Sequence, residues 1–163
     1  MNYAQIRQFD TANGTGIACT LFVSGCNFFC KNCFNKEYQD FNYGNLWTKE
    51  VKNNFIKMCL NPNVDHVSIL GGEPLSQDYE TMYDLIKSIK EEVKKPIWLW
   101  TGHIYEELSI KQKEIVSMVD YLIDGQFIEK LKNYKLNFKG SSNQRILDVQ
   151  KSLKENKVIL YDC

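Results

Sequence analysis

The sequence predicts a single α/β domain over residues 1–163, built as an open, partial (β/α) barrel with a mainly parallel sheet. Short apolar runs alternate with helical stretches, which is the pattern of βαβ units. Each candidate strand ends in a loop of unusual residues, and the carboxyl ends of parallel strands line active sites. The units are too few for a closed eight-stranded barrel, which takes about 250 residues.

Four apolar runs are the candidate strands of this sheet. They cover Ile17–Ser24, His66–Leu70, Pro96–Trp100 and Tyr121–Ile123. Their following loops hold a cysteine cluster, Gly71-Gly72-Glu73-Pro74, Thr101-Gly102 and Asp124-Gly125. Because carboxyl ends of parallel strands meet at one edge, we expect these four loops to converge on one face.

Helices are expected between the strands. Thr48 has the side chain of an N-cap, and apolar residues follow it at helical spacing as far as Cys59. Apolar residues from Tyr79 to Val93 recur on one face of an amphipathic helix. A broken helical region precedes the fourth strand and extends to about Val119.

The pattern weakens after the fourth strand. Arg145–Val149 suits either the start of a helix or an alternating strand. Val158–Tyr161 is expected to be a last short strand. The block Gly140-Ser-Ser-Asn-Gln-Arg145 reads as a polar, turn-forming loop.

Composition and charge narrow the class of protein. Lys and Arg together number 20, as do Asp and Glu, so the chain lacks the basic excess of a nucleic-acid-binding domain. The amino terminus does not read as a secretory signal, and no segment approaches 18 uninterrupted apolar residues. We therefore expect a cytoplasmic protein, in a reducing compartment where clustered cysteines bind metal or do redox work.

Cys26, Cys30 and Cys33 form a C-x3-C-x2-C cluster directly after the first strand. Three thiolates this close can wrap around one compact inorganic core. Cubane iron–sulfur clusters usually take four thiolates, so a cluster held here would have one iron without a local protein ligand. An open coordination position is typical of a reactive metal centre rather than a structural one.

Two other metal sites remain open alternatives. A structural zinc site needs a fourth ligand, normally from a second Cys or His pair, whereas His66 and His103 are isolated. A plain electron-transfer cluster needs a fourth cysteine, for which Cys163 is the candidate. Cys19 and Cys59 lie among apolar positions and are expected in the core.

The cysteine cluster in the loop after a first strand resembles the signature of the radical S-adenosylmethionine superfamily. The resemblance implies a [4Fe-4S] cluster on the three cysteines, with S-adenosylmethionine chelating the fourth iron through its amino and carboxylate groups. Many members have an aromatic residue just before the third cysteine, packed against adenine. Asn32 stands there in this chain. The expected adenine contacts therefore come from the backbone of residues 32–34, including Cys33, and from Phe34.

The loops of the other strands extend this resemblance. On its own, the Gly-Gly-Glu-Pro segment is a turn with a solvated glutamate, but beside the cysteines it resembles the superfamily's GGEP element. That likeness implies that Gly72 and Glu73 contact the methionine amino group. Thr101 is expected to reach the ribose. Asp124 is expected to contact the cofactor or a backbone amide, and a helix cap is its alternative.

A narrower resemblance spans residues 13–145. The blocks that carry it are Asn13–Gly16, Leu21–Cys26, Cys33–Asn35, Trp98–Gly102, Leu122–Gly125 and Gly140–Arg145. They resemble the activating proteins of anaerobic ribonucleoside-triphosphate reductases. This implies that flavodoxin or ferredoxin supplies an electron and that the reductase receives a glycyl radical. A radical enzyme with a different substrate and a metal-stabilised binding module without catalysis remain as alternatives.

Overall fold

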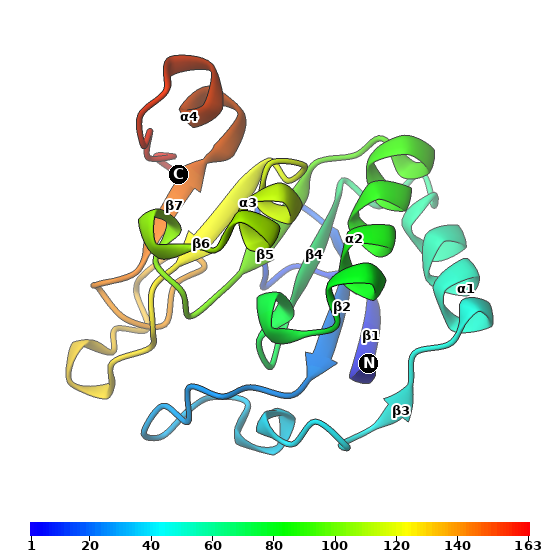
Figure 1. Cartoon of the computed structure of the whole chain (residues 1–163), viewed down its shortest axis with the longest axis horizontal. Helices are drawn as coiled ribbons and strands as arrows, with labels where there is room; N and C mark the ends of the chain where they lie inside the picture. The colour runs from blue at the N-terminus through cyan, green and yellow to red at the C-terminus, as the bar shows by residue number, and fades with distance from the viewer.

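Seven strands form one open sheet in the computed structural model, which describes residues 1–163 (Figure 1). They are β1 (Asn2–Asp10), β2 (Ala18–Ser24), β3 (Asn45–Leu46), β4 (His66–Gly71), β5 (Ile97–Trp100), β6 (Tyr121–Asp124) and β7 (Arg145–Asp148). The strand order is β3-β1-β2-β4-β5-β6-β7. β2, β4, β5 and β6 run parallel, and the outer strands pair antiparallel. The predicted α/β fold with an open, mainly parallel sheet is confirmed.

Four α-helices connect or follow the strands. They are α1 (Lys49–Cys59), α2 (Tyr79–Ser88), α3 (Ile110–Val116) and α4 (Val149–Glu155). The predicted cap is confirmed, because the Thr48 hydroxyl accepts a hydrogen bond from the amide of Val51 at 3.2 Å. The predicted helix ending at Val93 is α2 continued by a π-helical turn, Ile89–Val93. None of the helices combines the length and the apolar character that crossing a bilayer requires.

The main core lies between the sheet and the helices α1, α2 and α3, which share one face of it (Figure 1). Alternate residues of the central strands point into this core, such as Leu21 of β2 and Ile69 of β4. Cys19 and Cys59 are fully buried there, as predicted. The central strand β2 is buried along its whole length, which is typical of a parallel strand covered on both faces.

The opposite, inner face of the sheet carries larger aromatic and polar side chains. Trp98 of β5 packs there with Ile123 and Ile146. Two buried polar residues of β4, His66 and Ser68, hold the β1–β2 turn against this face, because both contact the carbonyl of Asn13, at 2.9 and 2.7 Å. The turn thus closes one end of the inner face.

The structure corrects the predicted elements at both ends of the chain. β1 and β3 were not predicted. Arg145–Val149 was expected to be either a strand or the start of a helix, and it contains both, because β7 ends at Asp148 and α4 begins at Val149. Val158–Tyr161 is not a strand: it makes only an isolated bridge between Leu160 and Leu147. A single bridge satisfies too few backbone groups to form a strand.

Candidate cofactor site

The three clustered cysteines lie in the segment after β2, residues 25–35, called here the cysteine loop. Its start is held by two backbone bonds, from the amide of Gly25 to the carbonyl of Tyr38 at 2.8 Å and from that of Cys26 to Gln39 at 3.0 Å. The amide of Cys33 closes a turn onto the carbonyl of Cys30 at 3.2 Å. The loop lies below the carboxyl ends of the parallel strands (Figure 1).

The thiols of Cys26, Cys30 and Cys33 are half-buried, free of disulfides and line one cavity. Burial raises the pKa of the Cys26 thiol, and the nearby Glu73 carboxylate adds to the shift. Such a thiol becomes a thiolate when a cation binds it. No three Cys, His, Asp or Glu side chains are placed to hold a single metal ion. A cubane binds each thiolate through a different iron, so its ligands need not converge on one point.

The glycines of the loop after β4 are required by the protein's own packing. A Cβ on Gly71, whose φ is 112°, would lie 2.6 Å from the carbonyl oxygen of Val23. A Cβ on Gly72 would lie 2.5 Å from the carbonyl oxygen of Gly25 and 2.7 Å from that of Tyr38. The sequence suggested that glycine is needed here so that the backbone can approach a ligand. The structure gives a second reason, which is that these glycines let β4 approach the cysteine loop.

Gly72→Ala is expected to destabilise the protein by about 2 kcal/mol, within the usual cost of overpacking. The atoms that the new methyl group meets are backbone oxygens, which have little room to move. Gly102→Ala is the matched control, because the nearest atoms to its methyl group, at 2.7 Å, belong to the ring of Phe28, a side chain that can move more easily than backbone. Urea unfolding of the two variants checks this. Equal stability of both would contradict the close approach.

Glu73 ties the loop after β4 to the loop after β5. Its carboxylate is 2% exposed and accepts hydrogen bonds from the amide of Leu75 at 3.0 Å, the hydroxyl of Thr101 at 2.7 Å and the amide of Gly102 at 2.7 Å. Burial raises its pKa to about 7, against the effect of these three donors. A carboxylate has about four lone-pair sites, so room for one further donor remains.

The cavity has a volume of about 590 Å³, within the range of small-molecule sites. All three cysteines line it, as do the predicted site residues Phe34, Gly72, Glu73 and Thr101. It continues along the inner face of the sheet to Arg7 and Asn13. The predicted convergence of the strand-end loops is thus seen in the structure, and the residues present fit a cluster with a nucleotide-sized ligand beside it.

Comparison with known proteins agrees with this site. Residues 12–147 match the model of a family described as a 4Fe-4S single cluster domain. Three relatives are named anaerobic ribonucleoside-triphosphate reductase-activating protein. That of Escherichia coli K12 is 38% identical over 148 residues, covering 88% of this chain and 96% of the relative. That of Haemophilus influenzae is 36% identical over 150 residues (90% and 97%), and that of Enterobacteria phage T4 is 35% identical over 148 residues (90% and 93%).

This chain belongs to the family of anaerobic ribonucleoside-triphosphate reductase-activating proteins. The match to the cluster family includes every residue of the cysteine loop and of the loops after β4, β5 and β6. The family resemblance stated from the sequence is therefore confirmed, together with a 4Fe-4S cluster domain. The contacts of individual residues with a cofactor stay predictions.

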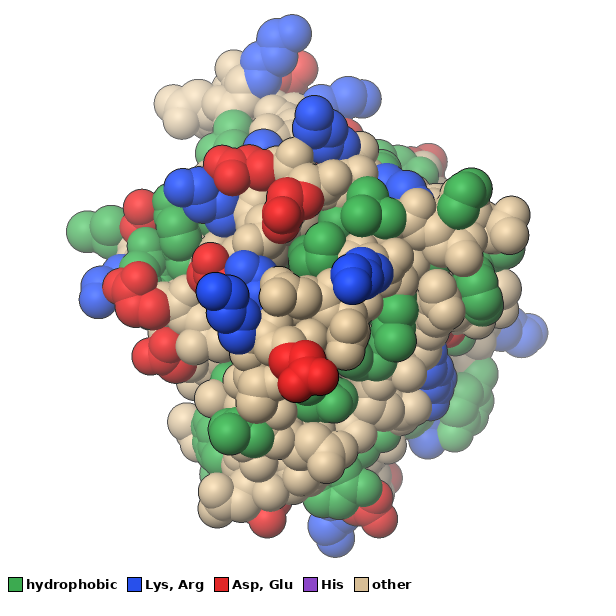
Figure 2. All heavy atoms as spheres, turned by 90° about the vertical axis from the view of Figure 1, so that its right-hand side faces the viewer, with side chains coloured by type: hydrophobic (Ala, Val, Ile, Leu, Met, Phe, Trp, Pro, Cys, Tyr) green, Lys and Arg blue, Asp and Glu red, His purple; other side chains and the backbone are tan.

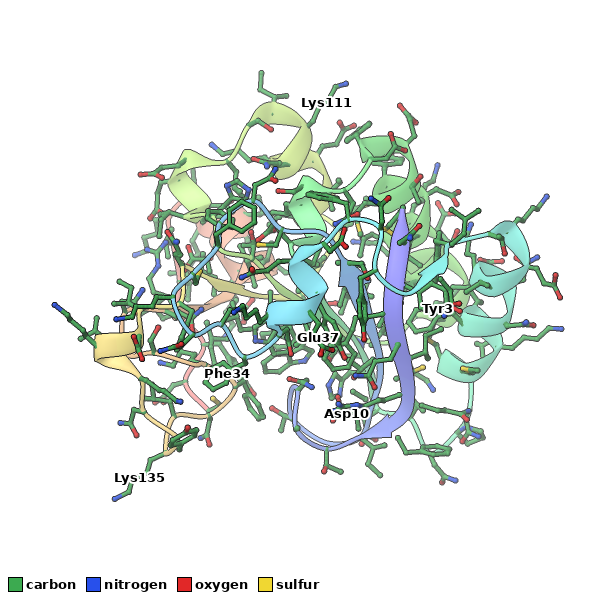
Figure 3. The ribbon with its side chains drawn as sticks, turned by 90° about the horizontal axis from the view of Figure 1, so that it is seen from below. Tyr3, Asp10, Phe34, Glu37, Lys111 and Lys135 are labelled. Atoms are coloured by element: carbon green, nitrogen blue, oxygen red, sulfur yellow. The ribbon has the colours of Figure 1, made fainter.

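Asn32 does not line the cavity. It has a left-handed backbone, with φ of 53°, and its side chain amide donates to the carboxylate of Glu129. The same carboxylate forms an ion pair with Lys31 at 3.5 Å. Asn32 therefore links the cysteine loop to the 3₁₀ turn Glu129–Leu131. Phe34 lies where the cysteine loop meets the segment that follows this turn (Figure 3), and its ring packs on Phe127.

Asp124 ends β6 and is fully buried, but it does not line the cavity. Arg145 of β7 donates to both of its oxygens, at 3.0 and 2.5 Å, and the amide of Tyr105 donates at 2.9 Å. Arg145 also forms a two-bond pair with Glu106. Of the three predicted roles, the structure shows the contact with a backbone amide, and Asp124 is not the N-cap residue of a helix. A cofactor contact of Asp124 stays a prediction.

Arg145→Ala is expected to destabilise the protein by about 3–5 kcal/mol, because it leaves the buried Asp124 carboxylate without its cation. Arg145→Ala with Asp124→Asn is expected to lose less, since the uncompensated charge is gone. Lys31→Ala, which removes an exposed ion pair, should cost under about 1 kcal/mol. Thermal or urea unfolding measures the stability of all three variants. If Arg145→Ala lost less stability than Lys31→Ala, the buried pair of Arg145 and Asp124 would not be important for stability.

Sequence reasoning missed Phe127 and left the role of the Gly140–Arg145 block open. Phe127 forms the wall of the cavity with Phe34, and a Cβ on Gly140 would lie within 3.0 Å of both rings. Gln144 accepts from the amide of Gly140 and donates to the carbonyl of Gly125, so the Gly140–Arg145 block brackets the loop after β6. The sequence did carry one signal for this side of the cavity, which is the alternation of lysines with aromatic residues after position 127.

Proposed function

We propose that this chain is a radical S-adenosylmethionine enzyme, one radical domain over residues 1–163, that forms a glycyl radical on an anaerobic ribonucleoside-triphosphate reductase. The observation that carries the proposal is a cavity lined by three cysteines and by no fourth cysteine or histidine. A cubane held there by these three cysteines would keep one iron free for a small molecule. The names of the relatives support the reductase as the partner.

When bound, the cluster and S-adenosylmethionine would supply the reactive chemistry: one-electron reductive cleavage of the sulfonium, with release of methionine, and abstraction of a hydrogen atom from the substrate. The protein supplies binding, orientation and exclusion of side reactions. Cys26, Cys30 and Cys33 hold the cluster. Flavodoxin or ferredoxin is proposed as the electron donor.

Residues around the cavity are proposed to orient S-adenosylmethionine. The backbone of Gly72 and the remaining lone pair of Glu73 are proposed to accept from its amino group, and the lining of the cavity by both residues together with the cysteines supports this. Thr101 lines the cavity next to Glu73 and is proposed to reach the ribose. Phe34 is proposed to stack on adenine, with backbone contacts from residues 32–34.

A glycine of the partner suits the proposed hydrogen abstraction. Glycine has no side chain to block the approach of the radical, and the resulting radical is delocalised over two flanking peptide groups. The substrate is a loop of another protein, and the open sheet leaves the inner face accessible to it. The cavity reaches along that inner face as far as Asn13.

The test is an anaerobic incubation of the reconstituted protein with dithionite, S-adenosylmethionine and the reductase. We expect an electron paramagnetic resonance doublet of a glycyl radical on the reductase, and none when its target glycine is replaced by alanine. Cofactor cleavage without that doublet would favour a different substrate. Uptake of one zinc and no iron would indicate a binding module, and electron transfer without cleavage a ferredoxin-like carrier.

A further inference from the structure

Residues 128–139, called here the lysine flap, are strongly basic in a chain of balanced charge. The flap contains Lys130, Lys132, Lys135 and Lys139 but only one acidic residue, Glu129. None of the four lysines forms an ion pair, and Glu129 is engaged by the cysteine loop. The flap as a whole therefore keeps an excess of positive charge, four lysines against one glutamate, although Lys132 lies near enough to Glu129 to help lower the pKa of that carboxyl group.

The flap is fixed at the mouth of the cavity. The indole of Trp100 in β5 donates to the carbonyl of Phe138 at 2.8 Å, and the amide of Ser142 donates to Leu131 at 2.9 Å. Tyr134 and Lys139 of the flap line the cavity together with the cysteines. A polypeptide whose glycine enters the cavity would therefore meet residues of the flap.

Apolar side chains are exposed among these lysines. Tyr134 is 81% exposed and Phe34, beside the flap, is 55% exposed. The ammonium group of Lys132 lies over both rings, 4.6 Å from the centre of Tyr134 and 5.1 Å from that of Phe34. Exposed aromatic anchors surrounded by charged residues are typical of protein–protein interfaces, in which the charges guide association and the aromatic groups hold the partner.

We propose that the lysine flap is the docking surface for an acidic segment of the polypeptide substrate, beside the glycine that enters the cavity. This inference rests on the proposed function and deepens it. Its occupant is the substrate rather than the electron donor, because flap residues line the cavity itself and only the substrate has to enter there.

The opposite side of the molecule offers a matched control. Figure 2 shows the side around α1, where side chains of both charges are interspersed with scattered apolar ones. Lys49 and Lys57 of α1 are exposed and form no ion pair. Lys130 and Lys135 in the flap are also exposed, and neither lines the cavity (Figure 3 shows Lys135 pointing outward at the tip).

The test compares Lys130→Glu/Lys135→Glu with Lys49→Glu/Lys57→Glu, both reconstituted with the cluster. We expect the flap variant to bind the reductase about 10-fold more weakly, mainly through slower association, and with a weaker dependence on salt. The α1 variant should bind like the wild type. Lys130→Gln/Lys135→Gln, which neutralises the charges, should fall between them. Cofactor cleavage driven by dithionite without the reductase should be unchanged in all variants.

Equal binding by the flap and α1 variants would overturn the docking surface while leaving the proposed function standing. So would a flap variant that binds the reductase normally but is reduced slowly by flavodoxin, because the donor would then be the occupant. Failure of the wild-type protein to bind or activate the reductase would instead refute the proposed function. The three results are distinguishable in the same set of experiments.

Discussion

Cys30→Ala is expected to abolish the formation of 5′-deoxyadenosine from S-adenosylmethionine by the reduced protein. Cys30 is one of only three cysteines that line the cavity, so the variant leaves a cluster with two protein ligands. Loss of a residue that merely supports a metal ligand costs about 10–100-fold in metal affinity or activity. Loss of a ligand should therefore lower cleavage by more than about 100-fold, measured by chromatography after anaerobic reduction.

Cys163→Ala is the matched control for this prediction. Cys163 is exposed at the end of the chain and does not line the cavity, so its loss should leave both iron content and cleavage unchanged. Iron and sulfide analysis accompany the assay. Cleavage that survives Cys30→Ala, or is lost in Cys163→Ala, would contradict ligation by the three clustered cysteines.

Glu73→Ala is expected to destabilise the protein by about 3 kcal/mol and to weaken binding of S-adenosylmethionine. The change leaves the amides of Leu75 and Gly102 and the hydroxyl of Thr101 without their acceptor inside the protein. Each buried donor without a partner costs about 1–3 kcal/mol. Water that enters the space left by the side chain can accept from some of the three donors, so the expected total is at the lower end of their combined cost. Urea unfolding of the cluster-free protein measures the loss.

Two further variants distinguish the loss of the Glu73 hydrogen bonds from the loss of a carboxylate as such. Glu73→Gln keeps one acceptor oxygen, so it should lose less stability than Glu73→Ala. Glu107→Ala removes an exposed carboxylate and should stay within about 0.5 kcal/mol of the wild type. A Glu73→Ala protein as stable as Glu107→Ala would show that the carboxylate does not tie the two loops together.

The central strands were predictable because each is a mainly apolar run that is buried over nearly its whole length. β1 was missed because its pairing with β2 shifts register between Tyr3 and Gln5 and again between Arg7 and Asp10. Such irregularities break the alternation of period two by which a half-buried strand is recognised. β3 has two exposed residues, Asn45 and Leu46, and leaves no pattern to read.

The candidate site also has a part that was predictable from the sequence and a part that was not. The cysteines and the segment around Glu73 form short local motifs, so their grouping followed from strand order. Asn32 pairs with Glu129, 97 positions away, and Arg145 pairs with Asp124, 21 positions away. Neither pair has a periodic signature, because each depends on how loops fold back over the end of the sheet. The expected backbone contact of Asn32 with adenine, and the expected contact of Asp124 with the cofactor or a backbone amide, were therefore stated without knowledge of these side-chain partners.

The most direct measurement is electron paramagnetic resonance of the reconstituted, reduced protein before and after addition of S-adenosylmethionine. We expect one four-iron cluster per chain whose spectrum changes when S-adenosylmethionine binds its free iron, and the same change in the Cys163→Ala variant. A four-iron cluster whose spectrum is indifferent to S-adenosylmethionine, or a preparation without iron, would contradict it.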